Sequence, residues 1–186
     1  MYASSYNRLF WGMIVLIFHI NLGPINVLPN FAGYMLIYSG LNILSSQHKI
    51  YEKGKLPAII LVILTLKDVW HNKDNSIMIG SSYNLGLVTM LIGAVTAVVD
   101  LYLIYIICKG ICELCREREL DSLMTNTADA WKFYFVISLI FLFSIPFSIN
   151  LPVGYNIFLF IVGMIKGIAI ICIMVMFRKC RVQLGT

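Results

Sequence analysis

The chain has 186 residues, of which 60% are hydrophobic and only 12% are charged, and its mean hydropathy is +0.86. Because a soluble domain carries about 25% charged residues, this composition excludes an ordinary soluble protein and predicts an all-α bundle of transmembrane helices. The net charge of +5 does not indicate a nucleic-acid partner, because the basic residues are distributed as in a membrane protein.

Six apolar segments approach or exceed the length needed to cross about 30 Å of hydrocarbon. In chain order, the predicted spans cover residues 9–21, 31–44, 56–70, 77–107, 131–149 and 153–177. The first two are short, and Gly23, Pro24 and Pro29 interrupt the apolar run between them. They form either a helical hairpin or a single span followed by a re-entrant segment. All 186 residues are expected to belong to one integral membrane domain.

The lysines and arginines fall mainly on one side of this topology. Eleven of the fourteen lie on the same side of the membrane as the N-terminus in this topology. Lys67 and Lys73 lie on the opposite side, and Lys166 lies within the sixth span. Since positively charged loops remain in the cytoplasm, both termini are expected there. The aromatic residues Trp131 and Tyr134 are expected at the same inner interface.

Two opposite charges lie inside otherwise apolar spans: Asp100 in the fourth and Lys166 in the sixth. Counted from the basic residues that end each span, Asp100 lies about 13 Å and Lys166 about 18 Å deep. A charge in hydrocarbon costs at least ~2.5–3.5 kcal/mol, so such residues usually face a protein interior and indicate a functional site.

The Asp100–Lys166 pair has two interpretations. Gly93-x-x-x-Ala97 and Gly163-x-x-x-Gly167 offer small-residue faces on which the fourth and sixth helices can approach each other. A direct ion pair is then within reach of the lysine side chain. The pair either holds the two helices together or forms the polar centre of a site for a small solute, an ion or a coupling proton.

Asparagines near helix-breaking residues define a second candidate region on the outer face. Asn21 and Asn26 lie around Gly23-Pro24, and Asn150 precedes Pro152. Irregular backbone at membrane depth is tolerated where it lines a cavity, which predicts a polar outer vestibule. Ordinary turn and capping roles for these asparagines are the alternative.

The longest polar segment, residues 109–132, is expected to be a cytoplasmic connector that continues the fourth helix. Its charges of mixed sign are typical of a solvated surface. An apolar edge formed by Leu114, Leu120, Leu123 and Met124 suits the membrane surface or a protein partner. A noncatalytic sensor or accessory subunit that acts through this connector is therefore the alternative to a solute-binding protein.

Enzyme signatures such as His-Glu-x-x-His, Gly-x-Ser-x-Gly and the phosphate-binding loop are absent from the sequence. No catalytic residues, metal ligands or cofactors are predicted, and an intramembrane enzyme is only a minor alternative. The histidine pair His19 and His71, near Asp68, lacks a metal-binding spacing.

Length and topology resemble the substrate-binding subunits of energy-coupling-factor transporters, which are small six-helix proteins with cytoplasmic termini. The resemblance implies a membrane protein that binds a small solute. That family carries an Ala-x-x-x-Ala motif in its first span for docking an energising partner, and the segment 10–18 here lacks it, so no residue roles are transferred. The chain also has the general look of small multi-pass proteins of the bacterial cytoplasmic membrane.

Overall fold

The computed structural model describes residues 2–17, 21–22, 25–26, 29–66, 87–147 and 155–185. In chain order, its elements are α1 (Ala3–Ile17), β1 (Asn21–Leu22), β2 (Ile25–Asn26), α2 (Asn30–Leu44), the 3-10 turn η1 (Lys49–Tyr51), α3 (Glu52–Thr65), α4 (Leu87–Glu117), α5 (Asp121–Phe147) and α6 (Tyr155–Gln183). The predicted all-α class is confirmed, with six helices and one ribbon of two residues per strand in the described chain.

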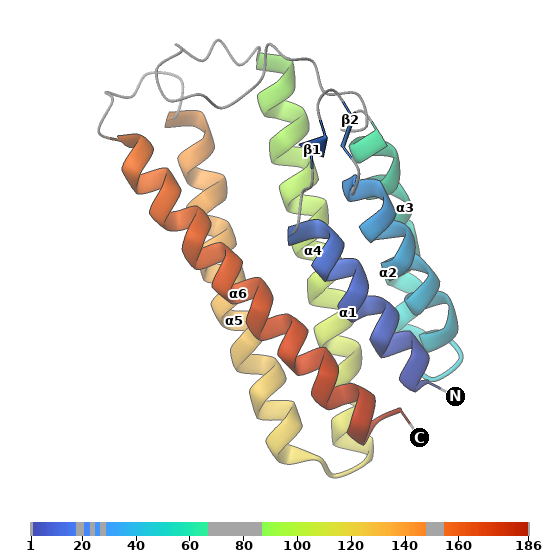
Figure 1. The fold of residues 1–186 in the computed structure, drawn as a ribbon. Helices are drawn as coiled ribbons and strands as arrows, with labels where there is room; N and C mark the ends of the chain where they lie inside the picture. The colour runs from blue at the N-terminus through green and yellow to red at the C-terminus, as the bar shows by residue number, and fades with distance from the viewer. Residues whose placement is uncertain are drawn as a thin grey trace.

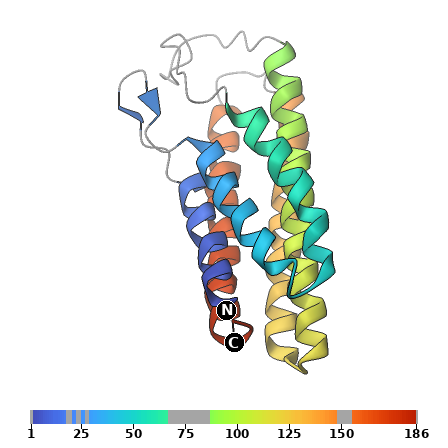
Figure 2. The same cartoon turned by 90° about the vertical axis from the view of Figure 1, so that its right-hand side faces the viewer.

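The helices run alternately up and down, and each packs on the next along the chain (Figures 1 and 2). Because α6 also packs on α1, the six helices form a closed ring. Both termini, the α2–α3 turn and the α4–α5 turn lie at the lower end in Figure 1, which we call the terminal end. The opposite end is the far end.

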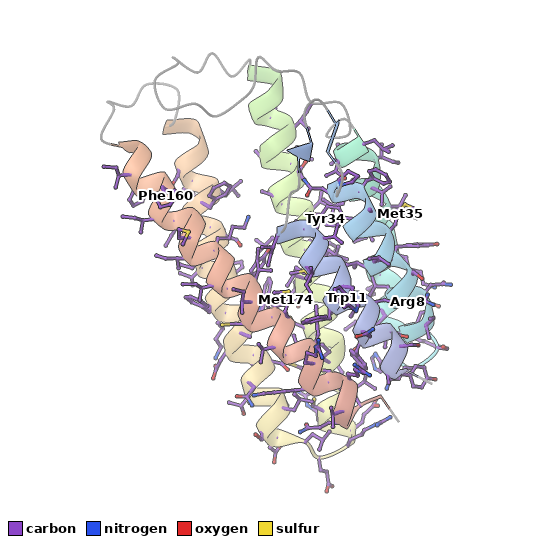
Figure 3. The ribbon with its side chains drawn as sticks, viewed as in Figure 1. Arg8, Trp11, Tyr34, Met35, Phe160 and Met174 are labelled. Carbon is purple, nitrogen blue, oxygen red and sulfur yellow. The ribbon has the colours of Figure 1, made fainter. Side chains whose placement is uncertain are left out.

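Three helices have the length and apolar composition of a membrane span: the stretches Leu91–Glu117, Asp121–Ser144 and Phe160–Gln183. This is the character of an integral membrane protein. The helices α1, α2 and α3 have 15, 15 and 14 residues, about 21–22 Å of rise, which is less than the ~30 Å hydrocarbon core. Large apolar side chains cover the outside of the long helices, and Phe160, 70% exposed, marks this surface on α6 (Figure 3).

The hydropathy pattern predicts the positions of the helices more accurately than the residues at which they begin and end. The second predicted span agrees closely with α2, whereas the fifth begins ten residues after the start of α5 at Asp121. A helix continues into its polar residues after the apolar stretch ends, so hydropathy underestimates helix length. Between α1 and α2, β1 pairs with β2 in an antiparallel ribbon, so the first two segments pack as a helical hairpin.

Glycines allow α1 and α2 to pack with their backbones in contact. A Cβ atom on Gly33 would lie 2.8 Å from the Gly12 carbonyl oxygen, and one on Gly12 would lie 2.8 Å from the Gly33 carbonyl oxygen. Further along the same contact, a Cβ on Gly40 would lie 3.0 Å from the Ser5 carbonyl oxygen. Small residues of this kind give close helix contacts where lipid supplies no hydrophobic driving force.

The glycines expected to bring the fourth and sixth helices together do not do so. A Cβ atom on Gly93, Gly163 or Gly167 would meet nothing within 4 Å. Instead, α4 packs on α3 and α5, and α6 packs on α5 and α1. The predicted small-residue contact between these helices is therefore wrong.

Polar contacts close the ring at the terminal end. The Ala3 N–H donates to the Gly185 carbonyl at 3.1 Å, and Gln47 Nε2 donates to the Leu184 carbonyl at 3.0 Å. The Tyr6 hydroxyl donates in turn to Gln47 Oε1 at 3.2 Å. Burial raises the pKa of this hydroxyl well above its usual value, so it remains a donor. These bonds join α1, the α2–α3 turn and the end of α6.

Residues 109–132 form the ends of two helices rather than an irregular connector. As predicted, α4 continues into this segment, and it ends at Glu117. The apolar edge is largely occupied, because Leu114 and Leu123 are buried and Leu120 and Met124 pack against the core. What this hairpin exposes is mainly its charges.

The α4–α5 turn stores local strain at Glu119, the described non-glycine residue with a positive φ, 56°. The Leu120 N–H donates to the Cys115 carbonyl at 2.8 Å, as in a glycine-type helix C-cap. We expect Glu119→Gly to raise the free energy of unfolding by about 1 kcal/mol, because glycine adopts this conformation without steric cost. Reversible unfolding in detergent measures the change.

The matched control for this substitution is Glu113→Gly, inside α4. It should lower the free energy of unfolding by about 1 kcal/mol, since glycine is a poor helix former. Equal losses at both positions would contradict the assigned role of Glu119.

Candidate functional site

Asp100 faces the interior of the ring. It belongs to a stripe on α4 at intervals of three and four residues, and Ile104, Ile107 and Ile111 on this stripe are fully buried. Toward the far end the stripe continues through Ala97, partly exposed, to Gly93, which is exposed. Asp100 therefore lies where the tightly packed interior of α4 gives way to a more open one.

Two tyrosine hydroxyls bind the Asp100 carboxylate. The Tyr34 hydroxyl from α2 donates to Oδ1 at 3.0 Å, and the Tyr134 hydroxyl from α5 donates to Oδ2 at 2.5 Å. Both tyrosines are buried, and Figure 3 shows Tyr34 on the side of α2 that faces α4. We call this arrangement the Tyr–Asp–Tyr bridge, and it links three helices.

The bridge hydrogen-bonds the carboxylate without neutralising it. Phenols are neutral donors, and among the described residues no ion pair includes Asp100. A carboxylate offers about four acceptor positions, of which the two phenols use two. Asp100 thus keeps the capacity to accept further hydrogen bonds.

Lys166 also lies on an interior stripe, between the buried residues Val162 and Ala169 of α6. Its Nζ lies 4.7 Å from the centre of the Phe141 ring on α5, a cation–π contact. The described ion pairs do not include Lys166, so the direct bond to Asp100 that the sequence allowed is not formed. Side chains lean toward the N-terminus of their own helix, and in α6 that direction leads to the far end, away from Asp100.

The two charges are instead related through α5. Tyr134 contacts Asp100, Phe141 contacts Lys166, and Ser138 lies between them on the same face at intervals of four and three residues. The rise from Tyr134 to Phe141 is about 10 Å. This face of α5 carries a carboxylate contact, a hydroxyl and a cation contact in sequence.

Ser138 differs from the other helical hydroxyls of the spans. Thr96, Thr127 and Ser144 each donate to the carbonyl four residues earlier, as is common for such residues. The Ser138 side chain is only 8% exposed, and its hydroxyl interacts with the Tyr134 phenol rather than with the carbonyl four residues earlier.

Only part of the predicted outer vestibule lies within the described residues. Asn21 and Asn26 are directly paired across the β1–β2 ribbon, at the turn between α1 and α2. Asn150 lies outside the described residues, as do His19, Asp68 and His71. The vestibule stays a prediction.

Sequence reasoning missed both tyrosines of the bridge. Tyr134 was expected at the membrane interface, but it is 1% exposed and points to Asp100. A usable signal was present, because a carboxylate inside an apolar bundle needs hydrogen-bond donors and tyrosine carries one on an apolar ring.

A separate surface cavity of about 310 Å³ lies between α2 and α3, lined by Met35, Tyr38, Ser39, Ile59 and Val62. Its lining is almost entirely apolar and includes neither Asp100 nor Lys166. Comparison with protein-family models, curated proteins and solved structures gives no match.

Proposed function

We propose that this chain is a multi-pass membrane protein that binds a small solute at a polar centre formed by Asp100 and Lys166. The observation that carries the proposal is the Tyr–Asp–Tyr bridge. It fixes a carboxylate inside an apolar ring while leaving its charge without an ion-pair partner among the described residues. Charges in such surroundings are expensive, and they commonly mark solute or ion pathways.

Six membrane spans with both termini in the cytoplasm form part of the proposal. The described lysines and arginines other than Lys166 all lie in helix halves or turns near the terminal end. This asymmetry favours the terminal end as the cytoplasmic side of a bacterial membrane. The exposed apolar side chains of α4, α5 and α6 then contact lipid.

A ligand screen with charge variants tests this function. Purified protein in nanodiscs is melted in the presence of Na⁺, K⁺, small amines, carboxylates, amino acids and sugars, and hits are quantified by calorimetry. We expect at least one solute to raise the melting temperature. Asp100→Asn or Lys166→Met should weaken its binding at least ~10-fold, since each loses an interior charge contact.

The chain supplies a matched control for both substitutions. Asp129 and Lys132 form an exposed pair at 3.5 Å on α5 near the terminal end, and Asp129→Asn and Lys132→Met should leave binding unchanged. The proposal is wrong if no solute protects the wild type, or if protection persists in both interior variants.

The accessory-subunit alternative rests on the tip of the α4–α5 hairpin. Arg116, Glu117, Arg118 and Glu119 are all exposed there. A protein partner at this face would be recognised by charge rather than by apolar burial, because the leucines of the hairpin are occupied. Charge reversal at Arg116 and Arg118 that abolishes capture of a membrane partner, together with an empty ligand screen, favours this alternative.

A further inference from the structure

We infer that the polar centre accepts a short zwitterion, with its cationic group at Asp100, its anionic group at Lys166 and a hydrogen bond to Ser138 between them. The inference rests on the proposed function and specifies the class of solute. It follows from three groups on or against a single face of α5.

The Asp100 end is suited to an ammonium group. Its two oxygens each accept one phenol hydrogen bond, and about two acceptor positions remain. The phenols also hold the carboxylate in one orientation, so binding a ligand costs little additional side-chain entropy at Asp100.

The Lys166 end is suited to a carboxylate. Its ammonium group has three donors. It lies over the Phe141 ring, which accepts none of them as a conventional hydrogen bond. Gly163 and Gly167 flank the lysine on α6, and a Cβ on either would meet nothing within 4 Å. An anion can approach on this side without displacing a packed side chain.

Ser138 supplies a polar group between the two charge contacts. Its hydroxyl is enclosed and interacts with the Tyr134 phenol, whereas Ser144 on the same helix bonds the backbone. A solute carboxylate that reaches Lys166 along α5 passes the Ser138 hydroxyl and offers it a charged acceptor. Binding therefore requires a small adjustment that opens the hydroxyl to the solute.

The spacing selects a short zwitterion over other charged solutes. The contact residues of the two charges, Tyr134 and Phe141, lie about 10 Å apart along α5. We take this rise as the separation of the two charges and allow about 3 Å for a charge-assisted hydrogen bond at each end. The solute's own charges are then about 4 Å apart, as in an amino acid whose amine is two or three carbons from the carboxylate. A solute with a single charge would leave the interior charge of either Asp100 or Lys166 without a counter-charge.

Isothermal calorimetry with a graded series tests the inference. The probes are 3-aminopropanoate and 4-aminobutanoate, the longer 6-aminohexanoate, the methyl ester of 4-aminobutanoate as a cation, and its N-acetyl derivative as an anion. We expect the two short zwitterions to bind at least ~10-fold more tightly than the other three probes. The ester and the N-acetyl derivative each lose one charge contact, and 6-aminohexanoate is too long to make both contacts without strain.

Variants assign the contacts. Ser138→Ala should weaken the short zwitterions roughly 3- to 10-fold, the equivalent of one hydrogen bond, whereas Ser144→Ala should not change their affinity. Lys166→Arg keeps the charge and should keep binding, and Lys166→Met should remove the preference for the zwitterion over the ester. Circular dichroism and gel filtration verify that each variant is folded.

The outcomes separate this inference from the proposed function. If the methyl ester or an inorganic cation binds as tightly as the zwitterions, and Lys166→Met has no effect, the zwitterion assignment is wrong while solute binding at Asp100 stands. If no solute of any class binds, both are wrong. Equal losses in Ser138→Ala and Ser144→Ala overturn the role of Ser138.

Discussion

Gly33→Ala should lower the free energy of unfolding by about 2 kcal/mol, the cost of overpacking a close contact. The added methyl group would lie 2.8 Å from the Gly12 carbonyl oxygen and 2.9 Å from Leu16 Cγ. The first of these neighbours is backbone inside a helix, which cannot rotate away. The helices α1 and α2 would have to separate, weakening a contact that extends to Gly40.

Gly163→Ala is the matched control, because its methyl group would meet nothing within 4 Å. Alanine is the better helix former, so this variant should gain about 0.5–1 kcal/mol. Denaturant unfolding of both variants in the same detergent measures the two effects, which we expect to have opposite signs. A loss at Gly163 as large as that at Gly33 would contradict the assigned packing.

Tyr134→Phe should lower the free energy of unfolding by about 2 kcal/mol, the usual contribution of a hydrogen bond to a charged acceptor. The hydroxyl donates to Asp100 Oδ2 at 2.5 Å from a side chain that is 1% exposed. The variant keeps the ring and its packing, so the loss reports the hydrogen bond. Unfolding in detergent, followed by tryptophan fluorescence, measures it.

Tyr102→Phe provides the control, because this ring is 50% exposed on the outside of α4. Its effect should be within about 0.5 kcal/mol. In an Asp100→Leu background the effect of Tyr134→Phe should nearly vanish, since the acceptor is already gone. A full loss that persists in that background would mean that Tyr134 stabilises the ring through something other than the bridge.

The sequence predicts the helical class and the approximate positions of the helices, because long apolar runs carry that information locally. Pro29 marks the start of α2, and the predicted and observed bounds of that helix nearly coincide. The start of α5 at Asp121 is not predicted, because the first turns of this helix are polar and hydropathy marks only apolar segments.

Neighbour relations between helices could not be predicted in the same way. Small residues near Asp100 and Lys166 suggested that α4 contacts α6, but the glycines that bring helices together are Gly12 and Gly33. A glycine that faces a helix and one that faces open space read identically in a sequence. The ring order, in which each helix packs on the next, is set by the whole set of contacts.

The interior position of Asp100 followed from its charge alone, but its partners did not. An aspartate in an apolar span requires donors without specifying which. Tyr34 lies 66 residues earlier and Tyr134 lies 34 residues later. Lysine was the obvious candidate by charge, yet the lean of its side chain toward the far end directs it to Phe141.

The Tyr–Asp–Tyr bridge also has a consequence for biosynthesis. Chains enter the membrane from the N-terminus, so Tyr34 is in place when Asp100 is inserted, whereas Tyr134 has still to be made. The carboxylate is therefore held by a single donor until α5 arrives, and α4 must enter on the strength of its apolar residues.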